Sequence, residues 1–211
     1  MKEKFDFKIN DASKTYFVSD THFGHKGIID FCNRPFKSVE EMDKELIIKW
    51  NEKVPEDGLV FHLGDFAWGG HPFWENIRKQ LNGDIILIKG NHDEKNLTKT
   101  GAETLFKNVT YQLKLLIEDR PVYLNHNPFL CYAGTYRDKN SLVYQLHGHV
   151  HVTRKAPKGM DIKRVLANEF PTQYDVGVDF NDYAPLSWKE VDEKIKEQIK
   201  ENNNLKMWIN E

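Results

Sequence analysis

Cysteine is scarce in this sequence. Its 211 residues include only Cys32 and Cys131, which lie far apart and form no Cys-x-x-Cys pair. This spacing argues against a disulfide scaffold and against a zinc site built from thiolates, so we interpret both as reduced structural thiols. An excess of charge of either sign is also missing, because 30 Lys and Arg residues nearly balance 32 Asp and Glu residues. A strongly basic nucleic-acid-binding protein is therefore not expected.

Long hydrophobic runs are absent as well. No apolar run approaches the roughly 20 residues that cross a bilayer, and residues 1–10 contain no apolar stretch of the kind found in signal peptides. The sequence thus predicts a cytoplasmic protein with no membrane partner. It also contains no linker, internal repeat or low-complexity tract, so we expect residues 1–211 to form a single domain.

Short apolar runs rich in β-branched and aromatic residues alternate with amphipathic segments. The runs are 16–18, 59–61, 85–88, 122–124 and 176–178. Each is short enough to be a strand buried on both faces. Capping boxes at 38–41 and 187–190, and a proline at position 72, predict the starts of three helices. Strands that alternate with helices indicate an α/β protein.

Polar side chains of types that can bind metals follow four of these runs and the short run 145–146. In sequence order they are Asp20 and His22, Asp65, Asn91 and His92, His126, and His149 and His151. Open α/β sheets place their ligand sites at the carboxyl ends of strands. Glycines precede Asp65, Asn91 and His149, which fits sharp exits from the strands. Nine histidines against two cysteines favour nitrogen and oxygen ligands.

The ordered set Asp-x-His, Gly-Asp, Gly-Asn-His-Asp, His and Gly-His-x-His, from position 20 to 151, resembles the signature of the calcineurin-like metallophosphoesterases. The resemblance implies a four-layer α/β sandwich, in which two mixed β-sheets pack together and are flanked by helices. It also implies a dinuclear centre with one metal on Asp20, His22 and His151, a second on Asn91, His126 and His149, and Asp65 as the bridge. His92 would face the leaving group instead of binding metal.

The chemistry of these residue types agrees with that assignment. Carboxylate, imidazole and amide-oxygen ligands suit divalent Mn, Fe, Zn or Ni, and the sequence leaves the metal open. Water shared by two such ions loses a proton easily, and the resulting hydroxide can attack phosphorus in line. The departing alkoxide needs a proton, which His92 can donate at neutral pH because an imidazole has an ordinary pKa of about 6.5.

The block after the bridging carboxylate departs from one branch of the family. Protein Ser/Thr phosphatases read Gly-Asp-x-x-Asp-Arg-Gly there, whereas residues 64–70 read GDFAWGG. Trp68 thus replaces the second aspartate, and the arginine is missing. The chain looks more like small bacterial and phage phosphoesterases, and we favour a phosphodiester over a phosphomonoester substrate. Trp68, Tyr132 and Tyr136 lie on loops where they could stack a nucleobase.

Several polar residues have two interpretations each. His25 could contact substrate phosphate, or cap a helix or face solvent. Arg34 could bind phosphate through its forked guanidinium or form a structural ion pair. His62 is interpreted as a core histidine or a support for the ligands. The basic segment 154–164 could grip a polyanionic substrate, although a solvated loop is the favoured interpretation.

Two other functional classes remain open. One is a nuclease that would use segment 154–164 as a clamp on nucleic acid, which is not favoured. The other is a metal-binding module without turnover. Asp65 and His92 argue against it, because a purely structural site needs neither a bridging carboxylate nor an additional histidine. The expected partner is a phosphoester substrate, with nucleotides among the candidates, and the sequence indicates no protein partner.

Overall fold

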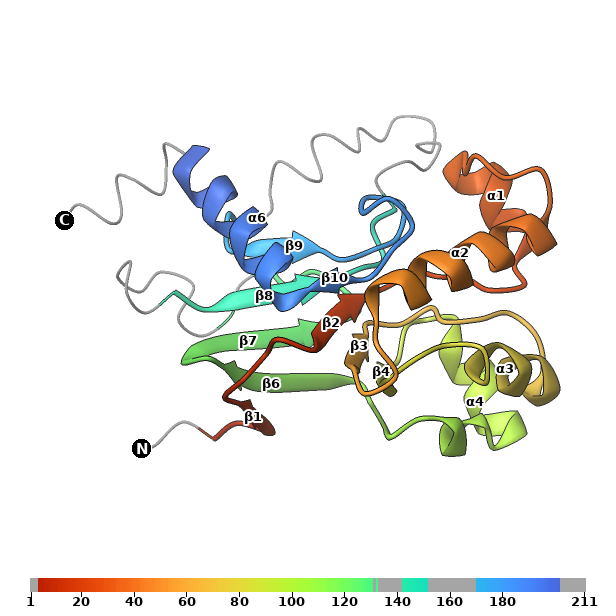
Figure 1. Cartoon of the computed structure of the whole chain (residues 1–211), viewed down its shortest axis with the longest axis horizontal. Helices are drawn as coiled ribbons and strands as arrows, with labels where there is room; N and C mark the ends of the chain where they lie inside the picture. Colours follow the sequence, from red (N-terminus) through yellow and green to blue (C-terminus); the bar gives the residue numbers. More distant parts are fainter. Residues whose placement is uncertain (1–3, 131, 133–141, 152–169, 202–211) are drawn as a thin grey trace.

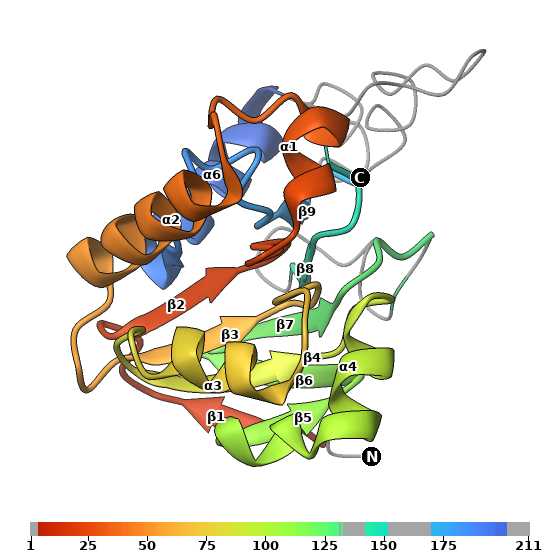
Figure 2. The same cartoon turned by 90° about the vertical axis from the view of Figure 1, so that its right-hand side faces the viewer.

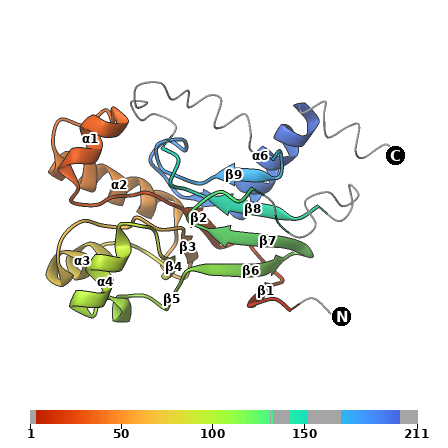
Figure 3. The same cartoon turned by 180° about the vertical axis from the view of Figure 1, so that it is seen from behind.

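The computed structural model describes residues 4–130, 132, 142–151 and 170–201. Its two five-stranded sheets pack together (Figure 1). The strand order of the first sheet, which can be followed in Figure 3, is β1 (Phe7–Ile9), β6 (Gln112–Ile117), β7 (Arg120–Asn125), β8 (Tyr144–His147) and β9 (Gln173–Asp175). The second has the order β10 (Leu186–Ser187), β2 (Thr15–Val18), β3 (Leu59–His62), β4 (Asp84–Ile88) and β5 (Asn108–Thr110). Each sheet combines one antiparallel pair, β6 with β7 or β10 with β2, with parallel pairs.

Helices flank the two sheets. They are α1 (Lys26–Cys32), α2 (Val39–Lys53), α3 (His71–Arg78), α4 (Asp93–Thr100), the short 3-10 helix η1 (Ala102–Leu105) and α6 (Trp188–Glu201). The first four lie on the side of the second sheet that faces away from the first (Figure 2), and α6 packs near β9 and β10. Two mixed sheets flanked by helices confirm the predicted fold class. Within the described residues, no helix has the length and apolar character that a membrane crossing requires.

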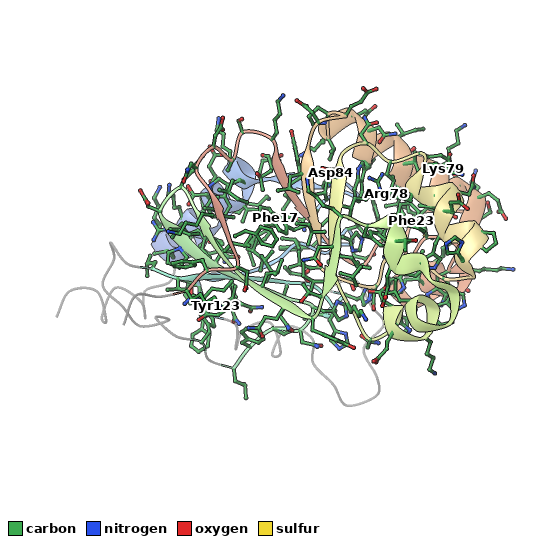
Figure 4. All side chains as sticks on the ribbon, turned by 90° about the horizontal axis from the view of Figure 1, so that it is seen from below. Phe17, Phe23, Arg78, Lys79, Asp84 and Tyr123 are labelled. Atoms are coloured by element: carbon green, nitrogen blue, oxygen red, sulfur yellow. The ribbon has the colours of Figure 1, made fainter. Side chains whose placement is uncertain are left out.

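The main apolar core lies between the two sheets. Phe17 and Phe61 enter it from the second sheet with stacked rings, 5.5 Å between centroids, and Leu115 and Leu124 enter it from the first. Phe17 points into this space in Figure 4, whereas the partly exposed Tyr123 of β7 points outward. Successive strand residues face opposite sides of a sheet, so alternate apolar positions fill the core. A second core lies between the second sheet and helices α1 to α4.

The predicted helix starts are confirmed. The Ser38 hydroxyl accepts a hydrogen bond from the Glu41 amide at the start of α2. At the start of α6, Ser187 and Glu190 each accept a hydrogen bond from the other's backbone amide, which is a complete capping box. Helix α3 begins one residue before Pro72. These signals lie within a few residues of each helix start, so they can be identified from the sequence without knowledge of the tertiary structure.

The predicted strand 176–178 is wrong. Strand β9 ends just before it, and Gly177 forms only an isolated bridge with Ser19. The Ser19 amide donates to the Val176 carbonyl at 3.0 Å, and the Val178 amide donates to the Ser19 carbonyl at 3.1 Å. This segment therefore ties the end of β2, in one sheet, to the end of β9, in the other. The residues that follow this segment in the chain therefore lie near the ends of both sheets.

Candidate metal centre

The polar segments converge at the carboxyl ends of five strands. Asp20 and His22 follow β2, Asp65 follows β3, Asn91 and His92 follow β4, His126 follows β7, and His149 and His151 follow β8. Strands β2, β3 and β4 are parallel in one sheet, as are β7 and β8 in the other. Backbone amides connect the exits. Asp20 donates to Gly64 and Gly148 donates to His126, while the His149 amide donates to the Asp20 carboxylate at 2.9 Å.

The backbone at these exits is strained. Positive φ angles between 50 and 70° occur at five candidate ligands, which are Asp20, His22, Asp65, His149 and His151. Residues with a Cβ rarely adopt this region, and each instance costs roughly 1–3 kcal/mol unless the surroundings impose it. Strain of this kind concentrates at functional sites. Here it accompanies the convergence of side chains from separate strands.

Glycines allow the close approach of these exits. Gly64 has φ +98°, which fits the sharp strand exit expected from the sequence. Gly148 precedes a ligand too, but its φ is not positive. A Cβ on Gly148 would overlap a carboxylate oxygen of Asp20 and the hydroxyl of Ser19. Gly148 is therefore needed because a side chain would not fit at this position, and not because its backbone conformation requires a glycine.

The first group of candidate ligands is Asp20, His22, Asp65 and His151, all of which are buried. Their donor atoms lie within 4.8 Å of one another. Among the described residues, neither Asp20 Oδ1 nor His22 Nε2 has a hydrogen-bond partner. Burial lowers the pKa of His22 well below its usual value, which keeps the ring neutral as a metal ligand must be. Two orphaned buried donor atoms in such a set fit a divalent cation.

The second group is Asn91, His126 and His149. The Asn91 Oδ1 atom lies 3.0 Å from both His126 Nε2 and His149 Nδ1, and these two nitrogens are 3.2 Å apart. Donor atoms bound at about 2.1 Å to one metal ion are about 3.0–3.4 Å from their neighbours. His126 Nδ1 donates to the Leu63 carbonyl at 2.8 Å, so Nε2 is the ring nitrogen that faces Asn91 and would bind a cation. The geometry and the tautomer both suit a second cation.

Asp65 belongs to both groups. Its Oδ2 atom lies 3.5 Å from His22 Nε2 on one side and 3.5 Å from His126 Nε2 on the other. Its Oδ1 atom accepts a hydrogen bond from the His92 amide at 2.9 Å. Burial by itself would raise the pKa of Asp65, but His126 and His22 hold it well below its usual range. The carboxylate is thus ionised and lies where a bridge between two cations would be.

The carboxylates of the site create a negative potential at the imidazoles. Burial by itself would lower the pKa of His126, but Asp65 and Asp20 raise it to about 9. Burial also opposes the charged form of His151, yet Asp179, Cys32 and Asp20 raise its pKa to about 11. A potential that stabilises an extra proton on these rings would stabilise a metal cation between them as well.

Arg34 forms the structural ion pair that the sequence left as one of two alternatives. Its guanidinium donates to both oxygens of Asp179, at 2.8 and 3.0 Å, and to the backbone carbonyls of Asp20 and Thr21. The same Asp179 carboxylate accepts a hydrogen bond from His151 Nδ1 at 2.8 Å. Arg34 is buried behind the ligands and does not line the cavity above them. A direct role in substrate binding therefore has no support here.

Asp179 is the functional candidate that the sequence analysis missed. It fixes the tautomer of His151, so that Nε2 points toward Asp20 Oδ1, 3.6 Å away. The signal was present, because Asp179 directly follows the apolar run 176–178, as the candidate ligands follow the runs that precede them. Cys32 is buried and also lies within 4.8 Å of the ligand atoms of His151 and Asp179.

Two other side chains support the ligand loops. Asp93 is fully buried and accepts hydrogen bonds from the amides of Asp65, Phe66 and Gly90. Burial and the neighbouring Asp65 raise the pKa of Asp93 to about 7. His62 is also buried, and burial lowers its pKa to about 3. Its Nε2 atom lies 2.9 Å from the Thr21 hydroxyl, which in turn donates to the Phe66 carbonyl.

A cavity of about 400 Å³ opens above the candidate ligands. His92 and His25 line it together with ligand side chains, and Phe31 of α1 forms part of its wall. The His25 ring stacks on the exposed Trp68 ring, with 4.3 Å between centroids. Tyr132 instead packs against Tyr123 and Phe170, away from the cavity lining. Tyr136, Cys131 and the basic segment 154–164 lie outside the described residues.

Comparisons with known proteins agree with this geometry. A family model for the calcineurin-like phosphoesterase superfamily domain matches residues 14–167. An uncharacterized protein of Methanocaldococcus jannaschii is 36% identical over 140 residues, which are 65% of this chain and 69% of that protein. The Gene 66 protein of Mycobacterium phage L5 is 29% identical over 170 residues, which cover 66% of this chain and 78% of its own length.

The fold is also similar to a solved structure. The crystal structure of a protein of unknown function from Aquifex aeolicus matches with a TM-score of 0.60 and 25% sequence identity. The match covers 85% of this chain and 97% of that chain. The similarity in fold therefore extends over most of this chain.

Proposed function

Because this chain belongs to the calcineurin-like phosphoesterase superfamily, we propose that it hydrolyses a phosphodiester at a centre of two divalent cations. The observation that carries the proposal is the position of Asp65 between two ligand groups. The first would comprise Asp20, His22 and His151, and the second Asn91, His126 and His149. When bound, cations in this set supply a water of lowered pKa for attack and positive charge at the phosphoryl oxygens.

Side chains of this chain would carry out the rest of the reaction, which is the transfer of a proton to the leaving oxygen. The ring of His92 lines the cavity but is absent from both ligand groups. Its own amide is fixed by Asp65, so its backbone is held in place beside the centre. His92 would donate a proton to the oxygen that leaves phosphorus, which is the contribution of a general acid. His25 would lie beside it and hold the position of Trp68.

The preference for a diester is supported by the charge of the cavity wall. No Lys or Arg is among the described residues that line the cavity, and the guanidinium of Arg34 already forms an ion pair with Asp179. A phosphomonoester carries about two negative charges near pH 7, since its second pKa is about 6. A diester carries only one, and its second substituent is uncharged. The wall around this centre therefore suits the diester better.

A hydrolysis assay tests the proposal. The metal-free protein would be loaded with Mn, Fe, Zn or Ni and assayed with bis(p-nitrophenyl) phosphate and p-nitrophenyl phosphate. We expect about two metal ions per chain, faster hydrolysis of the diester, and loss of activity with a chelator. Asp65→Asn should lower both metal content and hydrolysis. Asp57→Asn, at an exposed aspartate paired with Lys14, is the matched control and should change neither.

Three outcomes would count against the proposal. Binding of metal without hydrolysis of any phosphoester would favour a metal-binding module without turnover. Fewer than two ions per chain at saturating metal would contradict the dinuclear centre. Hydrolysis of single-stranded DNA in preference to small diesters would favour the nuclease alternative, and neutral substitutions in segment 154–164 would then test the clamp.

A further inference from the structure

Exposed aromatic rings lie at the two ends of the candidate centre. The side chains of Trp68 and Phe31 are each 45% exposed. The Trp68 ring lies 4.3 Å from His25 and 5.4 Å from His92. Phe31 lies at the other end, edge-on to His151 at 6.3 Å. Phe31 lines the cavity, and Trp68 stacks on His25, which lines it, so both partly exposed rings are available to a ligand beside the candidate centre.

The imidazole rings that lie between Trp68 and Phe31 show at which end of the candidate centre each of these two aromatic rings lies. His22 lies in the middle, 5.2 Å from His25 and 5.2 Å from His151 between ring centroids. Trp68 is therefore at the end where His92 lies, and Phe31 is at the end where His151 lies. Since His92 would protonate the leaving oxygen, the leaving group must depart at the Trp68 end. The substituent that stays on phosphorus then faces Phe31.

The Trp68 ring is also held in a defined plane. His25 stacks on one face of it, with 13° between the ring planes. A flat surface with fixed orientation suits a planar ring, because stacking needs parallel faces and little loss of side-chain freedom. No Lys or Arg in the described lining would neutralise a further phosphate. The matching group is thus planar and uncharged, as a nucleobase is.

We propose that the substrate is a phosphodiester between two nucleosides, with the base of the leaving nucleoside stacked on Trp68 and the base of the retained nucleoside against Phe31. This rests on the proposed function. In the step, the oxygen of water bonds to phosphorus and the bond from phosphorus to the leaving oxygen breaks. The attacking water releases one proton to solvent, and His92 gives its proton to the leaving oxygen and regains one from solvent. The products are a nucleoside and a nucleoside monophosphate.

Matched substrates test the Trp68 platform. One is a dinucleoside monophosphate, and the other is its analogue that lacks the base of the leaving nucleoside, so that the leaving oxygens have similar basicity. The products of the unmodified compound identify which nucleoside leaves. We expect the wild-type protein to prefer the complete substrate by about tenfold in kcat/KM. Trp68→Ala should bring this ratio close to one, while Trp68→Phe, which retains a stacking ring, should keep most of it.

Phe31 is tested at the opposite position. An analogue without the base of the retained nucleoside should be disfavoured by the wild type, and Phe31→Ala should remove that preference while keeping the preference at the leaving position. The matched control is Phe7→Ala, because Phe7 is a partly exposed aromatic residue on β1, outside the cavity lining. It should keep both preferences.

The possible failures are distinguishable. If the wild type hydrolyses diesters but treats complete and abasic substrates equally, the base-binding surfaces are contradicted and the proposed function stands. The base-binding surfaces are also contradicted if Trp68→Ala leaves the preference for the complete substrate unchanged. They are contradicted too if Trp68→Ala removes the preference at the retained nucleoside and Phe31→Ala removes the preference at the leaving nucleoside. If no diester is hydrolysed with any metal, the proposed function itself fails.

Discussion

At the scale of single residues, the candidate centre separates histidines of different roles. Five imidazoles line the cavity, from His22, His25, His92, His149 and His151. Three of these belong to ligand groups, and His25 stacks on Trp68. His92 is then the ring best placed to exchange a proton with a bound substrate.

His92→Ala should slow the hydrolysis of diesters with alkyl leaving groups by about 100- to 10,000-fold, because an alkoxide cannot depart without a proton. Diesters of p-nitrophenol should be much less affected, since this group leaves as a stable anion. The measurement is kcat for both substrate types. His71→Ala, at the start of α3, is the control and should alter neither rate. Equal loss with both leaving groups would remove His92 from the acid role.

Asp179→Asn should weaken metal binding at the group that contains His151. The substitution keeps the shape of the side chain but removes the charge that fixes the His151 tautomer. Loss of such an outer partner typically lowers metal affinity by about 10- to 100-fold. Titration of metal into the metal-free protein measures this directly. Asp182→Asn, at the exposed aspartate near Lys49, should have no effect. Unchanged affinity with a lowered melting temperature would show a purely structural role for Asp179.

At the scale of elements, parallel strands and short exits create the centre. Strands β2, β3 and β4 deliver their polar residues to one place because parallel strands end at the same edge. The Ser19–Gly177 bridge then joins that edge to the end of β9 in the other sheet. Helices are less directly involved, since α1 supplies a wall and α6 covers the core near β9 and β10.

Ser187→Ala should lower the free energy of unfolding by about 1 kcal/mol, because the substitution removes the cap of α6. Trp188 and Val191 of this helix are buried in the core between the sheets, so fraying of its start is costly. Urea denaturation measures the change, and metal affinity should be unaffected. The exposed Ser13 gives the control, since Ser13→Ala should change stability little. A decrease as small as that control would show that the capping box contributes nothing.

At the scale of the whole molecule, the two cores share the second sheet. One face of that sheet packs on the first sheet and the other on helices α1 to α4. We therefore propose that the chain is a single domain, which would unfold in one cooperative transition. The candidate centre joins the ends of both sheets, so cation binding there should stabilise the folded chain as a unit.

Saturating metal should raise the melting temperature. At a free concentration about 100 times the dissociation constant, binding adds about 2.7 kcal/mol to stability, which corresponds to about 5–10 °C for a chain of this size. Calorimetry of the metal-free and metal-loaded protein measures the shift, and a chelator should reverse it. Asp65→Asn should show a smaller shift. Two separate transitions would contradict the single domain, and the absence of any shift would contradict the cation site.

The sequence by itself determined the family and the α/β class, and it predicted the candidate ligands of the centre. These features are encoded locally, in apolar runs, capping boxes and candidate metal ligands directly after strands. Short elements such as β1 and α1 carried too little pattern to be predicted. The wrong strand at 176–178 has the composition of β-structure, but only the packing of the two sheets decides where pairing stops.

Only the tertiary structure decided how the side chains are used. Arg34 is 145 positions from Asp179, and no local pattern predicts that they pair behind His151. The stacking of His25 on Trp68 likewise depends on how two loops from different strands meet. Contacts between distant parts of the chain depend on the relative position of whole elements. Local preferences thus selected the candidate ligands, and packing chose their partners, their tautomers and the rings around the cavity.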